Sequence, residues 1–383
     1  MSPDRLERAR EAFEANFQRG AEVGAALSIW RGDEELLSVQ GGWRDAARTH
    51  PWTAETLVLI WSATKGLASA CALHAMERAG LPLDARVAEV WPEFGQCGKE
   101  SITIGQVLSH RAGLSALDAV DLSLLDHDGV ARAIEWQPPL WNDAGHGYGP
   151  RTFGFVVDEI VRRLSGGTPL GVYFRKHIGD PMDLDLWIGL PAEHHARVAQ
   201  MLAPRARGCE EPEDAFSQAL ADPGSLTRRA FASPGGLLGA SAMNSPAARS
   251  SSIPSLGGIG SASALARFYA MLASGGSANG VQIFRHHSIR QMEAPLSQGM
   301  DKVLRLETAF SAGFMKDPVG SDGEKLRRTF GTSLRAFGHP GAGGSLAFAD
   351  PEARIGFAYV MNQMEPGVLP KRRALSIVEA LYQ

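Results

Sequence analysis

Ser62 and Lys65 are the first residues in the chain whose types and spacing point to chemistry. They stand three positions apart at the start of an alanine-rich stretch, residues 62–79, which Gly80 follows. This spacing places two side chains on one face of a helix, and the glycine predicts where that helix ends. A serine hydroxyl is a weak nucleophile until a base removes its proton, and a lysine whose pKa is lowered by burial or nearby cations can be that base. The spacing alone is weak evidence, because most chance Ser-x-x-Lys patterns are solvent-exposed lysines beside a helix cap.

The bulk composition excludes several classes of protein. The chain has 383 residues, of which 44% are hydrophobic and 21% charged, as is usual for a soluble globular protein of one large or two closely packed domains. A formal net charge of −4 gives no basic surface for nucleic acid. No apolar run is long enough for a membrane span, and the charged N-terminus lacks the apolar centre of a signal peptide. The three widely spaced cysteines, Cys71, Cys97 and Cys209, favour reduced thiols and therefore a cytoplasmic location.

The elements that must position Ser62 and Lys65 follow from hydrophobic periodicity. We expect helices at 4–18, 104–110, 153–161, 262–272 and 374–381, a β-hairpin within 24–43, and strands at 334–339, 344–349 and 355–361. Residues 205–257 are too irregular to assign, and loops of this length often form functional walls or lids. The pattern predicts an α+β fold (an α/β sandwich), in which an antiparallel sheet is flanked by the N- and C-terminal helices and accompanied by a mainly helical domain.

This order of elements also predicts two domains. Residues 1–60 and 261–383 would form the sheet domain, residues 61–260 the mainly helical domain, and the active site would lie at the interface between them. Two stretches rich in glycine and polar residues are candidates for completing the site. Residues 141–150 form a loop that holds Tyr148 and leads into a helix near Thr152. Residues 337–345 form a strand edge whose glycines allow the backbone to approach a ligand closely.

Taken in order, three short motifs resemble those of a known group of serine hydrolases. Ser62-Ala63-Thr64-Lys65, Tyr148 before a helix, and His339-Pro340-Gly341 are similar to the motifs of enzymes with the class C β-lactamase and penicillin-binding-protein fold. Within that group, the chain most resembles the family VIII carboxylesterases, which act on short-chain esters. The resemblance extends from residue 24 to the last strand and implies a β-lactamase/transpeptidase-like fold. Further stretches that carry it are 81–84, 91–94, 102–104, 108–114, 257–262 and 350–352.

The resemblance implies a role for each motif residue. Ser62 would be the acylated nucleophile, and Lys65 and Tyr148 would form the base pair, with the lysine cation lowering the tyrosine pKa. Which of the two takes the serine proton stays open at this point. The backbone N–H groups of Ser62 and Ala342 would hold the oxyanion. His339, Gly341 and Trp141 would bind substrate.

Two positions depart from the β-lactamase pattern. Pro150 stands where the lactamases have an asparagine amide, and His339 stands where they usually have a lysine cation. Both changes weaken recognition of an anionic lactam and favour a neutral ester. We therefore expect a serine carboxylesterase with an acyl-enzyme on Ser62. The alternatives are a β-lactamase, a D-amino peptidase or an acyltransferase that uses the same residues, and a non-catalytic binding protein, which the intact Ser62, Lys65 and Tyr148 argue against.

Other residues favour structural roles. His110 would fix the loop at 111–113, and buried Cys71 would be inert. The adjacent pairs His194–His195 and His286–His287 point to opposite sides of the chain, so we expect neither a metal nor another cofactor. Gly343-Gly344-Ser345-Leu346-Ala347 approaches the nucleophile elbow of α/β-hydrolases but ends in alanine and lies on a predicted strand. The expected partner is a small-molecule ester, with no prediction of oligomeric state.

Overall fold

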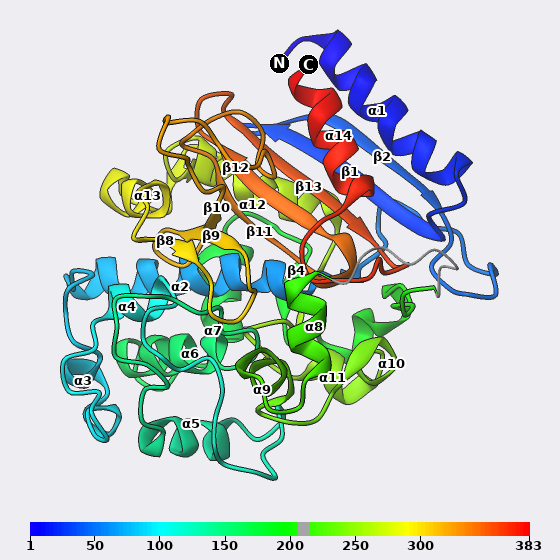
Figure 1. The fold of residues 1–383 in the computed structure, drawn as a ribbon. Helices are drawn as coiled ribbons and strands as arrows, with labels where there is room; N and C mark the ends of the chain where they lie inside the picture. Colours follow the sequence, from blue (N-terminus) through cyan, green and yellow to red (C-terminus); the bar gives the residue numbers. More distant parts are fainter. Residues whose placement is uncertain (206–213) are drawn as a thin grey trace.

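One eight-stranded antiparallel sheet organises the protein (Figure 1). The computed structural model describes residues 1–205 and 214–383. The strands follow the order β2-β1-β13-β12-β11-β10-β9-β8. Their bounds are β1 Gly24–Arg31, β2 Glu34–Gly42, β8 Ser297–Met300, β9 Glu307–Phe310, β10 Met315–Lys316, β11 Phe337–Pro340, β12 Leu346–Asp350 and β13 Ile355–Met361. Because β1 pairs with β13, with Ala25 opposite Met361, the first and last parts of the chain share one sheet, as the sequence predicts.

Helices cover both faces of this sheet. They are α1 (Pro3–Gln18) and α14 (Arg372–Tyr382), which contact each other, and α12 (Ala262–Ala273) on the opposite face. Phe357 and Tyr359 of β13 pack in the core with α1 and α14, whereas Ala358 and Val360 pack in the core with α12. A strand that is buried on both sides reads as a continuous apolar run, which explains the sequence of residues 355–361. The α+β prediction is confirmed.

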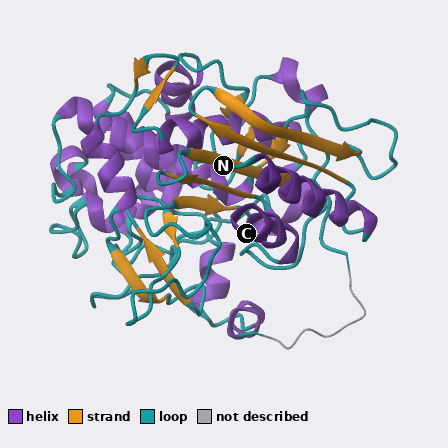
Figure 2. Cartoon of the chain, turned by 90° about the horizontal axis from the view of Figure 1, so that it is seen from above, coloured by secondary structure: helices purple, strands orange, loops and turns teal. Residues whose placement is uncertain are grey.

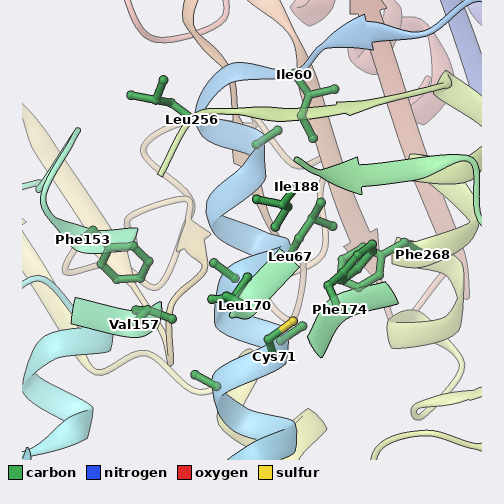
Figure 3. Close-up of a cluster of buried hydrophobic side chains, with 14 of the residues drawn as sticks. Ile60, Leu67, Cys71, Phe153, Val157, Leu170, Phe174, Ile188, Leu256 and Phe268 are labelled. Atoms are coloured by element: carbon green, nitrogen blue, oxygen red, sulfur yellow. The ribbon is translucent and has the colours of Figure 1, made fainter. Parts of the chain in front are cut away.

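The helix that carries Lys65, α2 (Thr64–Ala79), runs between the sheet and a group of helices from the middle of the chain (Figure 1). Every residue of α2 from Thr64 to Met76 is buried. Leu67 and Cys71 lie in a core whose other members include Phe153 and Phe174 (Figure 3). Burial raises the pKa of the Cys71 thiol, so this cysteine stays protonated. The helix ends at Ala79, and Gly80 adopts the left-handed conformation predicted for it, with φ of 69°.

The middle of the chain holds short helices and a small second sheet. The helices are α3 Val87–Val90, α4 Ile104–Leu108, α5 His127–Trp136, α6 Phe153–Leu164 and α7 Leu170–Phe174, and α13 His286–Glu293 follows α12. The second sheet has the order β3-β5-β4, with β3 Val58–Leu59, β5 Gly258–Gly260 and β4 Leu186–Ile188. The eight-stranded sheet draws only on residues outside 61–260. The two-domain division of the chain remains our proposal.

Two predicted strands begin later than the sequence suggests. Strand β11 starts at Phe337, because the Ala336 N–H donates to the Ser333 carbonyl and closes a turn over the preceding residues. Strand β12 starts at Leu346, because Gly343 and Gly344 have φ of 81° and 119° and form a turn that no strand accommodates. Ser345 therefore precedes the strand on which we expected it.

Within its described residues, the stretch that the sequence left unassigned contains four short helices. They are α8 Ala215–Ala221, α9 Leu226–Ala232, α10 Gly239–Met243 and α11 Pro246–Ser250. Three of them begin at a capping side chain, Asp214, Ser225 or Ser245, that accepts a backbone N–H three residues on. These capping residues are present in the sequence, but the irregular composition around them obscured the helices that they begin. Residues 206–213, and with them the thiol predicted at Cys209, lie outside the described residues.

The two chain ends lie close together (Figures 1 and 2), in accord with the contact between α1 and α14. Among the described residues, no helix is both long enough and apolar enough to cross a bilayer.

Candidate active site

Ser62 lies in a single 3-10 turn, η1 (Trp61–Ala63), between β3 and α2. Trp61 has φ of 50°, a conformation that is unusual for a bulky residue and that tends to occur at functional sites. Thr64 fastens the turn, because its Oγ1 donates to the Trp61 carbonyl at 2.5 Å and accepts the Gly258 N–H at 2.8 Å. The turn that presents Ser62 is thus bonded to strand β5.

Lys65 is fully buried, and its Nζ has three partners. It donates to the carbonyls of Pro150 and Ser255 at 2.9 and 2.8 Å and lies 3.4 Å from Ser62 Oγ. Burial, and then the nearby Arg151 cation, hold the pKa of Lys65 well below its usual value. A neutral amine has two N–H groups, which match the two carbonyls, and one lone pair, which is free to face the serine hydroxyl.

Two other buried lysines show how Lys65 differs. Lys99 Nζ donates to three backbone carbonyls at 2.7–2.9 Å, and Lys316 Nζ donates to three others. An ammonium satisfies all three of its N–H groups in each of those sites. Only at Lys65, of these three, is one carbonyl replaced by a serine hydroxyl. The arrangement around Lys65 is therefore suited to a lysine that gives up its third proton.

Tyr148 lies against this pair, with its ring centroid 4.8 Å from Lys65 Nζ and its hydroxyl hydrogen-bonded with Ser62. Burial raises the pKa of Tyr148 above its usual value, and the hydrogen bond with Ser62 offsets only part of this. The shift of the Tyr148 pKa is therefore upward, opposite to the lowering that we expected from a lysine cation. The physical reason is that both side chains are removed from water, which disfavours the phenolate and the ammonium alike.

The loop that carries Tyr148 is held by residues far away in the sequence. The Tyr148 N–H donates to the Asp301 carboxylate at 3.1 Å, and Asp301 also accepts the N–H groups of Val303 and Leu304. His110 accepts the Gly149 N–H on Nδ1 at 3.2 Å and the Gly147 N–H on its carbonyl at 3.0 Å. His110 thus supports the tyrosine loop rather than the loop at 111–113.

Strand β11 ends beside the serine turn because position 341 is glycine. A Cβ atom on Gly341 would lie 2.3 Å from the Ile60 carbonyl oxygen, so a side chain would push the two backbones apart. The next residue, Ala342, lines the cavity that holds Ser62. Within the described chain, neither the Ser62 N–H nor the Ala342 N–H has a hydrogen-bond acceptor. Two free N–H groups near a nucleophile are what an oxyanion site requires.

Ser62, Tyr148 and Ala342 line a cavity of about 190 Å³. Its wall is mainly apolar: Phe231, Leu237, Leu238, Leu256, Leu304, Met315, Val368 and Leu369 line it beside Trp61, Ser62, Tyr148, Pro150, Arg151, Gly239, His339, Pro340 and Ala342. His339 Nδ1 lies 2.7 Å from the Pro340 carbonyl oxygen, and burial lowers the pKa of His339 to about 3, so the ring is neutral near pH 7. The two other residues expected to bind substrate, Gly341 and Trp141, are not part of this wall; the Trp141 indole donates to the Gly145 carbonyl at 3.1 Å.

A profile described as Beta-lactamase matches residues 9–382, nearly the whole chain. The chain belongs to the beta-lactamase family.

Individual relatives within this family include hydrolases. The Esterase/beta-lactamase LipL of Mycobacterium tuberculosis is 29% identical over 357 residues, which cover 92% of this chain and 80% of that protein. A family VIII carboxylesterase is 33% identical with a TM-score of 0.87, covering 100% of this chain and 97% of the other. A penicillin-binding protein homologue from Caulobacter crescentus is 35% identical with a TM-score of 0.86, and the match covers 100% of this chain and 98% of the other. The beta-lactamase fold is thereby confirmed, and the chain is a hydrolase.

Several residues that shape this site in the beta-lactamase fold escaped the sequence analysis. Ser255 supplies a carbonyl to Lys65, and its hydroxyl donates to the Arg151 carbonyl at 2.7 Å. Asp301 and Thr64 position the tyrosine loop and the serine turn. Of these, only Thr64 was signalled, since it lies inside the Ser-x-x-Lys motif; Ser255 and Asp301 are 190 and 153 residues away from the groups that they bind.

The close approach of Gly341 to Ile60 generates a prediction. Replacing Gly341 by alanine should displace the Ala342 N–H from Ser62 and lower kcat/KM for ester hydrolysis by roughly 10²–10³-fold, as losing one oxyanion donor does. Steady-state kinetics beside a thermal melt measures this effect. Gly224→Ala is the matched control, because the nearest atom to a Cβ there, Asp222 Oδ1, is 3.5 Å away. An unchanged kcat/KM in Gly341→Ala would refute this role of the glycine.

Proposed function

We propose that this protein is a serine carboxylesterase that hydrolyses short-chain esters through an acyl-enzyme on Ser62. The observation that carries the proposal is the placement of Lys65 Nζ, 3.4 Å from Ser62 Oγ and bonded to two carbonyls that match a neutral amine. The small apolar cavity beside Ser62 fits a short acyl or alcohol group. The similarity to a family VIII carboxylesterase and to an esterase/beta-lactamase supports the reaction class.

The reaction has two steps. In the first, Lys65 accepts the Ser62 proton as Oγ attacks the ester carbonyl, and the N–H groups of Ser62 and Ala342 stabilise the oxyanion. The intermediate collapses to the acyl-enzyme, and the proton passes through the Tyr148 hydroxyl to the leaving alcohol. In the second step, Lys65 takes a proton from water, which attacks the acyl carbonyl, and Ser62 recovers its proton as the carboxylic acid leaves. Tyr148 remains a phenol throughout, in keeping with its raised pKa.

The first prediction of this proposal concerns the nucleophile. Ser62→Ala should reduce hydrolysis of p-nitrophenyl butyrate to the uncatalysed background and abolish covalent labelling by a fluorophosphonate, because no other group can carry the acyl chain. Ser345→Ala is the matched control: that hydroxyl is buried without a hydrogen-bond partner in the described chain, and its surroundings resemble a nucleophile elbow in sequence. Intact-mass measurement should find one label on the wild type and on Ser345→Ala. Labelling that persists in Ser62→Ala would disprove the assignment.

The second prediction concerns the base. Only neutral Lys65 can take the serine proton, so kcat/KM should rise with pH through the Lys65 pKa and level off well below pH 10.5. His339, with a pKa of about 3, does not titrate in this range, and the raised Tyr148 pKa leaves the phenol intact at alkaline pH. In Lys65→Arg, kcat/KM should be roughly 10²–10⁴-fold lower than in the wild type at every pH, because a guanidinium keeps its proton.

Lys99→Arg is the control for that experiment, since Lys99 is equally buried but does not line the cavity. Its pH–rate profile should match that of the wild type. A Lys65→Arg variant that retains wild-type turnover would show that Lys65 is not the base.

The third prediction separates esters from lactams. Position 150 offers a carbonyl to Lys65 but no amide to a ligand, and His339 is neutral, so an anionic lactam loses two contacts. We expect kcat/KM for p-nitrophenyl butyrate to exceed that for nitrocefin by at least about 100-fold on one preparation. His339→Lys should lower this ester-to-lactam ratio of kcat/KM, because the added cation would bind the carboxylate of the lactam. A ratio near one in the wild type would favour β-lactamase as the function.

A further inference from the structure

Arg151 is a buried cation without a carboxylate partner. The residue is 6% exposed, and among the described residues it forms no ion pair. Nε donates to the Pro234 carbonyl at 2.6 Å, and Nη2 donates to the carbonyls of Gly235 and Gly236. Burying a guanidinium is costly, and three carbonyl dipoles compensate its charge only in part. The positive charge of Arg151 is therefore balanced less completely than that of Arg373, which is paired with Glu22 at 2.7 Å.

One nitrogen of Arg151 is unused. Nη1 has no hydrogen-bond acceptor in the part of the chain that the structure describes, and it is not enclosed by protein atoms. Arg151 lines the cavity that holds Ser62. The other two nitrogens thus fix the guanidinium, and Nη1 is left to donate to one oxygen of a carboxylate.

The rest of the cavity wall carries no competing charge. Of the lining residues, His339 is neutral and Tyr148 keeps its proton. None of the lining residues is an aspartate or a glutamate. Arg151 follows Pro150 in the chain and is a different lining residue from His339, the position at which the resemblance would place the carboxylate of a lactam. The cavity therefore combines apolar walls with one fixed positive group.

We propose that Arg151 is a substrate-recognition residue and that the preferred substrates are short esters bearing one carboxylate, which the free Nη1 of Arg151 binds while Ser62 attacks the ester. This inference rests on the proposed esterase function and names the substrate class of the same site. It departs from the neutral ester that Pro150 and His339 suggest, because those two positions say nothing about a cation elsewhere in the cavity. A charge-assisted hydrogen bond in a partly enclosed site is roughly twice as strong as a neutral one.

The test compares charged and neutral esters of the same length by pH-stat. Monomethyl glutarate against methyl pentanoate places the carboxylate on the acyl side, and 4-acetoxybutanoate against butyl acetate places it on the alcohol side. In at least one pair, wild-type kcat/KM should favour the carboxylated ester by about tenfold or more. Arg151→Met should remove this preference, mainly through KM, while the neutral ester is still hydrolysed. Because the preference is a ratio within one preparation, partial misfolding of a variant does not affect it.

Arg249→Met is the matched control, since Arg249 is a half-buried arginine that donates to the His195 carbonyl and does not line the cavity. It should keep the wild-type ratio. Calorimetric titration of glutarate into Ser62→Ala, and into Ser62→Ala with Arg151→Met, measures carboxylate binding without turnover. Binding that requires Arg151 supports the inference. No wild-type preference in either pair, or a preference that survives Arg151→Met, overturns it. Failure to hydrolyse any of the four esters would instead contradict the esterase function.

Discussion

The contact between Lys65 Nζ and Ser62 Oγ can serve proton transfer only because the Lys65 amine is removed from water. Much of the fold is arranged so that this amine is buried. Helix α2 is buried along almost its full length, which its alanines permit, and the amine emerges where three segments meet. The carbonyls of Pro150 and Ser255 replace the water that an exposed lysine would bind. A lysine that is removed from water, and whose neutral amine makes all of its hydrogen bonds, can act as a base instead of remaining an inert cation.

The same removal from water explains why the tyrosine and lysine have different roles. Burial disfavours both an ammonium and a phenolate, so Lys65 tends to lose its proton and Tyr148 to keep its own. A lysine–tyrosine pair in which the cation activates the tyrosine requires a charged lysine, and nothing in the described surroundings of Lys65 provides a carboxylate to retain that charge. In the mechanism that we propose, the lysine is therefore the base and the tyrosine relays protons.

Local signals predicted much of this structure from sequence. The spacing of Ser62 and Lys65, the glycine after α2 and the continuous apolar run of β13 are each set within one element, so each could be recognised in the sequence. Position 341 was readable only in part: its glycine indicated a close approach, but the partner is the Ile60 backbone rather than a ligand. The supports at Ser255 and Asp301 could not be predicted, because a single serine or aspartate in a loop carries no pattern and its partner lies more than 150 residues away. The order of the three motifs along the chain indicated the family, which the spacing of Ser62 and Lys65 alone could not do.

Backbone groups supply most of the hydrogen bonds that hold the polar residues of this site. The Ser62 and Ala342 N–H groups, which we propose as oxyanion donors, have no acceptor in the described chain, two carbonyls accept from Lys65, and three more accept from Arg151. Backbone dipoles are fixed by the fold, so a substitution in the wall alters shape while leaving this polar frame in place. Within such a frame a single side-chain cation has a large effect, since no carboxylate in the wall weakens its field. In the inference that we propose, Arg151 then selects among substrates of one size, whereas the attack by Ser62 is the same for all of them.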